Sequence, residues 1–160
     1  MEKIPITKAG FARLKREMEI LKTISIPENI RDIETARAQG DLSENAEYSA
    51  AKERQSYLHG KVQELENNLA MSDVIELRNL GGDRAVFGAT VRIAEESTGK
   101  ETAYQLVGPL ESDLASNKIS VTSPIGRALI GKSVGDAVRV NTPGGVREFE
   151  ITDITVQEED

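Results

Sequence analysis

The stretch Gln39-Gly40-Asp41-Leu42-Ser43-Glu44-Asn45 separates two long runs of helix-forming residues and decides how they are arranged. Gly40 is the residue type that most often follows the last turn of a helix. Asp41 or Ser43 can cap the helix that comes next. Because so short a connection lays two helices side by side in opposite directions, the sequence predicts an antiparallel hairpin with its tip at residues 39–45.

The run before this tip predicts a helix over residues 8–38, capped by Thr7. At about 1.5 Å per residue such a helix is about 45 Å long. Pro27 interrupts it, and either lies in the first turn of a renewed helix or kinks one continuous helix. The apolar positions on either side of Pro27 are spaced four and three residues apart. They are Leu14, Met18, Leu21, Ile26, Ile30 and Ile33.

The run after the tip has the same spacing, which is typical of the seam of a two-stranded coiled coil. Its members are Tyr48, Ala51, Gln55, Leu58, Val62, Leu65 and Leu69. A hairpin whose arms pair with each other leaves no seam for a second copy, so we expect a monomer.

The second half of the chain has the sequence pattern of a β domain. Gly81-Gly82-Asp83 marks a linker, and alternating apolar residues from Phe87 onward predict a strand. Further strands are expected at 103–107, 119–122, 137–141 and 146–156, with a helix after Ser123-Pro124 that Gly131 ends. The prediction is an α+β protein: a coiled-coil hairpin over 1–76, a linker at 77–84, and a small antiparallel sheet with one helix over 85–160.

Composition excludes several classes of function. The chain has no cysteine and one histidine, His59, so it cannot form a disulfide scaffold, a zinc finger or a multi-histidine metal site by itself. The net charge is −7, which disfavours binding to bare phosphate backbone except through a local patch or a partner. There is no apolar run long enough to span a membrane and no signal-peptide pattern, so we expect a soluble cytoplasmic protein.

Two carboxylates at the tip have two open interpretations. Asp41 and Glu44 can be caps and dipole partners at the start of the second helix. They can also be ligands for a hard cation such as Mg²⁺, which prefers carboxylate oxygens. Two exposed carboxylates hold Mg²⁺ only weakly, so the second interpretation requires a partner that supplies the other ligands.

Basic residues flank the tip. Arg37 precedes it and Lys52 follows it at a similar distance, so they can share a face and contact a single-stranded backbone. The alternative is that both are ordinary solvated flanks of the coil. His59, beside Gly60 in mid-helix, is expected to be a surface residue rather than a ligand.

The segment Gly40-Asp41-Leu42-Ser43-Glu44-Asn45-Ala46-Glu47-Tyr48, followed by Ala50-Ala51-Lys52-Glu53, closely resembles the tip signature of the bacterial Gre family of transcript cleavage factors. The resemblance extends over the whole chain. Ile4-Pro5-Ile6-Thr7 resembles the start of the family. Its C-terminal segments resemble Phe87-Gly88-Ala89-Thr90-Val91, Ile119-Ser120-Val121, residues 123–132 and Thr142-Pro143-Gly144-Gly145.

The resemblance implies a set of roles. The coiled coil would enter the secondary channel of bacterial RNA polymerase, and the C-terminal domain, FKBP-like in fold, would dock near the channel mouth. Asp41 and Glu44 match the acidic pair that helps to bind a Mg²⁺ shared with the polymerase and positions a water. Arg37 and Lys52 match the patch that meets the nascent RNA 3′ end in a backtracked complex. The docking residues would be Ser120, Val121, Thr122, Ser123 and Pro124.

On this resemblance the protein is no enzyme itself, but stimulates hydrolysis in the polymerase active site. Two other functions remain open. A relative with the same fold can inhibit the polymerase by occupying the channel. An adaptor or chaperone could use the coil as an arm for protein contacts, although it would have no use for acidic residues at the tip.

Overall fold

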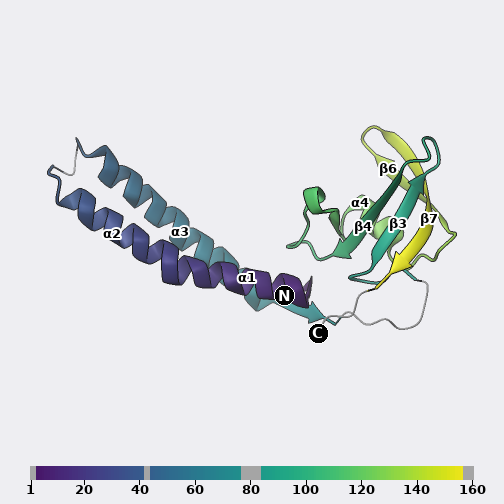
Figure 1. Ribbon diagram of the computed structural model, residues 1–160, viewed down its shortest axis with the longest axis horizontal. Coiled ribbons are helices and arrows are strands. Elements are labelled where there is room, and N and C mark those ends of the chain that lie inside the picture. Colours follow the sequence, from purple (N-terminus) through teal and green to yellow (C-terminus); the bar gives the residue numbers. More distant parts are fainter. Residues whose placement is uncertain (1–2, 42–43, 77–83, 157–160) are drawn as a thin grey trace. The chain divides into compact units, whose positions relative to one another are not determined.

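The computed structural model describes residues 3–41, 44–76 and 84–156 (Figure 1). Its contacts divide the chain into two units. Phe11–Met71 forms one, and the residues up to Gly10 together with those from Ser72 onward form the other. The sequence analysis put the division at 77–84, of which 77–83 lie outside the described residues. In the part of the chain that is described, no helix is both long and apolar enough to cross a membrane.

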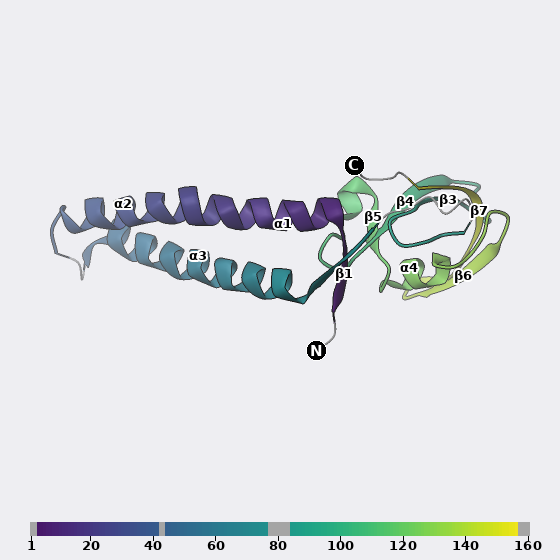
Figure 2. The same ribbon diagram turned by 90° about the horizontal axis from the view of Figure 1, so that it is seen from below.

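The predicted antiparallel helical hairpin is present. One arm runs through α1 (Lys8–Ile20), the π-helical segment η1 (Leu21–Ser25) and α2 (Ile26–Arg37). The other arm is the single helix α3 (Ala46–Met71). Figures 1 and 2 both show α2 and α3 side by side. Thr7 caps α1 as predicted, because its Oγ1 accepts a hydrogen bond of 3.0 Å from the Gly10 N–H.

Pro27 lies in the first turn of α2, and helical backbone runs into it from η1 without a break. A proline has no N–H to donate, and its ring crowds the carbonyl one turn earlier. The wider π-helical turn just before Pro27 accommodates both effects. Pro27 therefore lies in the first turn of an α-helical segment, as one of the two sequence interpretations had it, but the helical backbone continues through the π-helical turn before it.

The seam of the hairpin follows the predicted spacing with one error. Leu14, Ile33, Ala51, Leu58 and Leu65 are buried as expected. Ile30 is not, since 46% of it is exposed, and the neighbouring Asn29 lies in the seam at 2% exposure. Pattern analysis favoured the apolar residue of the two. The amide can be buried because its Nδ2 donates to the Ala51 carbonyl of α3 at 2.9 Å.

We expect Asn29→Ala to lower the free energy of unfolding of the hairpin by about 1–2 kcal/mol, because it removes a buried hydrogen bond and leaves a gap in the seam. Asn67→Ala, on the exposed face of α3, is the matched control and should change it by less than about 0.5 kcal/mol. Urea denaturation followed by far-ultraviolet circular dichroism measures both. Equal effects of the two changes would show that the amide does not hold the arms together.

The second unit contains a five-stranded sheet in the order β5-β4-β3-β7-β6. All neighbours are antiparallel except β4 and β5, which are parallel. The core on this sheet includes Leu129 of the helix α4 (Pro124–Leu129). The strands are β3 (Thr90–Glu95), β4 (Glu101–Val107), β5 (Lys118–Ser120), β6 (Ala137–Thr142) and β7 (Gly145–Thr155).

The predicted small, mostly antiparallel sheet with one helix is thus confirmed. The strand expected from Phe87 begins only at Thr90, because the chain turns at 86–89.

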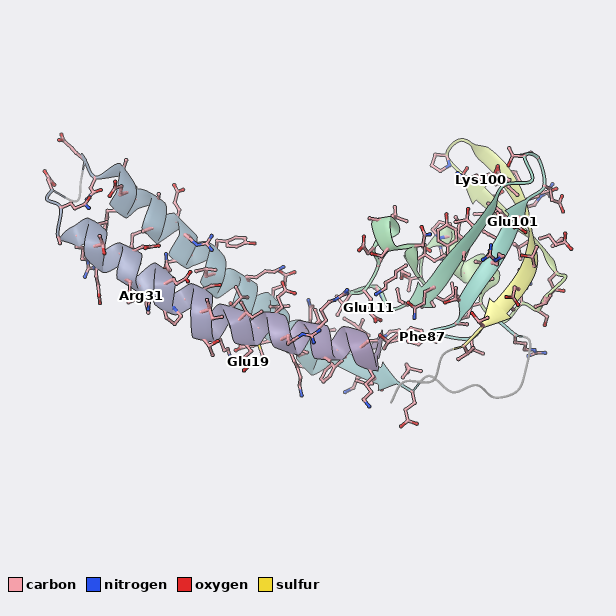
Figure 3. The ribbon with its side chains drawn as sticks, in the orientation of Figure 1. Glu19, Arg31, Phe87, Lys100, Glu101 and Glu111 are labelled. Carbon is pink, nitrogen blue, oxygen red and sulfur yellow. The ribbon has the colours of Figure 1, made fainter. Side chains whose placement is uncertain are left out.

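The second unit also contains a parallel strand pair that was not predicted. β1 (Ile4–Thr7) pairs with β2 (Ser72–Ile75) in parallel register. The buried Glu111, labelled in Figure 3 on the segment after β4, is hydrogen-bonded to β1. Its carboxylate accepts the Thr7 N–H at 3.0 Å, the Gly108 N–H at 2.9 Å and the Thr7 hydroxyl. A Cβ at Gly108 would collide with the Pro5 carbonyl oxygen, so only glycine allows this approach.

Candidate functional site

The acidic tip, residues 39–45, begins where α2 ends. Arg37 closes α2, and Gly40 has a φ of 132°, a backbone conformation that favours glycine. The predicted helix stop at Gly40 is confirmed. Asp41 follows it directly, and Glu44 lies two residues before α3. Leu42 and Ser43 lie outside the described residues.

The residue that caps α3 is Asn45, not Asp41 or Ser43 as the sequence analysis suggested. The helix begins at Ala46, and the Tyr48 N–H donates to Asn45 Oδ1 at 3.0 Å. This is the bond that a capping side chain makes to the third residue of a helix. The sequence interpretation placed the helix start too early, because three residues of the tip, Asp41, Ser43 and Asn45, have side chains that can cap.

The carboxylates of Asp41 and Glu44 belong to exposed residues at the end of the hairpin. In the described ranges no three or more acidic or histidine side chains gather in a way that could hold a metal ion. Two carboxylates on one short turn match the donor chemistry of Mg²⁺, but they are too few for a dedicated site. Asp41 and Glu44 are thus the residues of the tip that could hold such an ion, and the shared metal site stays a prediction.

The basic residues predicted beside the tip belong to opposite arms of the hairpin, Arg37 to α2 and Lys52 to α3. The Arg37 guanidinium lies 6.0 Å from the centre of the Tyr48 ring, across the two helices. Lys52 is one turn further along α3 than Tyr48, and residues four apart share a helix face. Lys52 Nζ donates to Gln55 Oε1 at 2.7 Å, and both Arg37 and Lys52 are exposed. The structure thus places Arg37 beside Tyr48 and Lys52 one turn further from the tip, and their shared contact with a single strand stays a prediction.

The expected docking segment, residues 120–124, is a tightly bonded turn between β5 and α4. Ser123 Oγ donates to the Ser120 carbonyl at 2.6 Å and accepts from the Gly126 N–H at 3.1 Å, which caps α4. Thr122 is held by its N–H, which donates to Ser120 Oγ at 3.0 Å. The predicted helix start after Ser123-Pro124 is confirmed. These hydrogen bonds hold the segment in place, so it presents a defined surface.

An apolar cleft of about 340 Å³ adjoins this segment. Leu114, in the 3₁₀ turn η3 (Leu114–Ser116), borders it and is 74% exposed. An apolar groove that is bordered by an exposed aliphatic side chain is a candidate surface for binding another molecule. The other apolar residues that line the cleft are Ile119, Pro124, Ile125 and Pro143.

Both halves of the chain match models of one protein family. Residues 4–74 match "Transcription elongation factor, N-terminal", and residues 80–156 match "Transcription elongation factor, GreA/GreB, C-term". The chain belongs to the GreA/GreB family. Its resemblance to the Gre family, inferred from the tip sequence, is thereby confirmed.

Relatives in the GreA/GreB family match over nearly the full length. The "Transcription elongation factor GreA" of Syntrophus aciditrophicus (strain SB) is 70% identical over 98% of this chain and 97% of its own. That of Anaeromyxobacter sp. (strain K) is 49% identical over 100% of this chain and 96% of its own. A solved structure, "Prokaryotic transcription elongation factor GreA/GreB from Nitrosomonas europaea", covers 97% of this chain and 99% of its own at 26% identity, with a TM-score of 0.44.

Three polar residues of this GreA/GreB-family chain were missed by sequence reasoning. Asn29 and Asn45 each donate a side-chain amide to a carbonyl on the opposite arm of the hairpin. Glu111 is buried among the backbone donors of β1 and the segment after β4. A signal for Asn29 was present, because it stands at a seam position where an apolar residue is expected. Nothing in the sequence around Glu111 indicated that this residue would be buried.

Proposed function

We propose that this member of the GreA/GreB family stimulates cleavage of backtracked nascent RNA in the active site of bacterial RNA polymerase. The observation that carries the proposal is a narrow helical hairpin ending in two exposed carboxylates, with no third acidic or histidine ligand beside them in the described residues. Family membership supports a role in transcription elongation. A protein with this role works in the cytoplasm, where bacterial transcription takes place.

Asp41 and Glu44 would hold a Mg²⁺ ion jointly with carboxylates of the polymerase. When bound, the ion neutralises charge that develops on the phosphate and lowers the pKa of a bound water. The contribution of this chain is to bring two carboxylates to the ion and to orient the water through Glu44. The protein thus supplies groups to an active site that it does not itself contain, and isolated protein should show no nuclease activity.

Arg37 and Lys52 would bind the extruded 3′ segment of the RNA. Both are exposed; Arg37 lies in the last turn of α2 and Lys52 on α3, one turn beyond the Tyr48 that Arg37 contacts. Two cations on one face can neutralise neighbouring phosphates of a single strand without reading its sequence. The rest of the chain is acidic, so the contact stays local.

Docking to the polymerase would use residues 120–124 together with the apolar cleft beside them. We expect Leu114→Asp to weaken binding to the polymerase about tenfold, because it puts a charge where an aliphatic side chain would be buried. Val146→Asp changes another exposed aliphatic residue of the same unit, 55% exposed on β7, and should leave affinity unchanged. Fluorescence anisotropy titration with core polymerase measures both. Equal affinities for the two variants would place the docking surface elsewhere.

The deciding experiment uses a backtracked elongation complex with 5′-labelled RNA, Mg²⁺ and the purified protein. We expect the RNA to be shortened from its 3′ end and extension to resume when nucleotides are added. Slower extension without shortening would identify an inhibitor that occupies the channel. Failure to bind polymerase would favour an adaptor. Analytical ultracentrifugation of the protein alone should show a monomer, because the arms of the hairpin bury their seam against each other.

A further inference from the structure

We infer that Asn45 is a positioning residue for the carboxylates of the acidic tip, an inference that rests on the proposed function. Its side chain joins the end of one arm to the start of the other. Nδ2 donates to the Ala36 carbonyl at 2.7 Å, and Oδ1 accepts from the Tyr48 N–H at 3.0 Å. Ala36 is buried in the last turn of α2, and Tyr48 lies in the first turn of α3.

The bond from Asn45 to Ala36 closes the loop that carries both carboxylates. Asp41 and Glu44 each lie between these two residues in the sequence, and the bond spans nine positions. A closed loop has fewer conformations than an open one, so less entropy remains to be lost when the carboxylates reach their working positions. The bond thus restrains both ends of this loop, at Ala36 and at Asn45, before any partner binds.

Only an asparagine can make both of these bonds at this position. Its amide has a donor and an acceptor on one short, planar group. A serine accepts from the helix N–H but is too short to reach the opposite arm as well. An aspartate caps a helix equally well, but it has no proton to donate, so its oxygen would face the Ala36 carbonyl oxygen. The cap and the bond between the arms can therefore be separated by substitution.

The burial of Ala36 and the contact of Asn29 support the positioning role of Asn45. Ala36 is 2% exposed and packs where the two arms meet, so its carbonyl is a fixed anchor rather than a mobile one. Asn29 makes a second amide-to-carbonyl bond between the arms, at Ala51. This second bond sets the register of α2 against α3. The bond from Asn45 to Ala36 then fixes the two ends of the loop relative to these helices.

The test measures the maximal rate of RNA cleavage at saturating protein and, separately, the protein concentration that gives half of that rate. We expect Asn45→Ser and Asn45→Asp to lower the maximal rate about tenfold, in the range found when residues that orient metal ligands are changed. The half-saturating concentration should stay within about twofold, because the docking surface is untouched. Asn67→Ser, the same change on the exposed face of α3, should alter neither value.

A second comparison asks whether Asn45 acts through the carboxylates. In a protein that already carries Asp41→Ala and Glu44→Ala, Asn45→Ser should cause no further loss, whereas independent effects would multiply. Thermal melts of the hairpin show that the variants are folded at the assay temperature. Wild-type maximal rates in both single variants, or a further tenfold loss in the triple variant, would overturn the positioning role while leaving the proposed function in place. If the wild-type protein itself stimulates no cleavage, the function fails and this inference fails with it.

Discussion

Replacing Asp41 or Glu44 by alanine is expected to lower the maximal rate of stimulated RNA cleavage by about 100-fold or more. Removing one preorganised group that stabilises charge in a transition state has an effect of this size. Affinity for the polymerase should change little, because the expected docking surface lies in the other unit, at residues 120–124. Single-turnover cleavage of a backtracked complex measures the rate, and a competition titration measures affinity.

The matched control for these variants is Glu47→Ala, which removes an exposed carboxylate in the first turn of α3. It should keep the wild-type rate, since Glu47 is not one of the proposed pair. Raising the Mg²⁺ concentration should restore part of the activity of Asp41→Ala, because a weaker site fills at higher concentration. Full activity of both tip variants would refute the shared metal site. Loss of polymerase binding in parallel with cleavage would show that the carboxylates serve docking instead.

The largest expected effect on stability is that of Glu111→Leu. The apolar side chain fills a similar space but leaves the Thr7 and Gly108 N–H groups buried without an acceptor. Each such group costs about 1–3 kcal/mol, so the free energy of unfolding of the unit that contains the sheet should fall by about 2–5 kcal/mol. Differential scanning calorimetry of the full chain measures the change.

Glu111→Gln separates the lost hydrogen bonds from the lost charge. One carboxylate oxygen accepts both backbone N–H groups, and the amide oxygen of glutamine can take its place. We therefore expect this variant to recover most of the stability. Glu150→Leu, an exposed position on β7, serves as the control and should change stability by less than about 0.5 kcal/mol. If Glu111→Leu is no worse than this control, the buried carboxylate does not hold β1 to the segment after β4.

Much of the fold could be predicted because its signals are local. The spacing of Leu58 and Leu65 predicts a helix seam, Gly40 predicts a helix stop, and Ser123-Pro124 predicts a helix start. Each of these patterns is satisfied within one or two turns of backbone, so no knowledge of distant residues is needed. The acidic tip belongs to the same class, since its residues are contiguous in the sequence.

Other features depend on which distant segments meet, and no local pattern carries that information. Thr7 and Glu111 are 104 positions apart in the sequence, and β1 pairs with a strand that follows the whole hairpin. Asn29 occupies the seam in place of Ile30 because the Ala51 carbonyl, on the opposite arm, accepts a hydrogen bond from its side chain.

The sequence by itself therefore determined the helices, most of the strands and the carboxylates at the tip. Only the tertiary structure decided which polar groups are buried and what they bind. The physical reason is that a buried polar group needs a partner, and here the partner lies on a segment that only folding brings near.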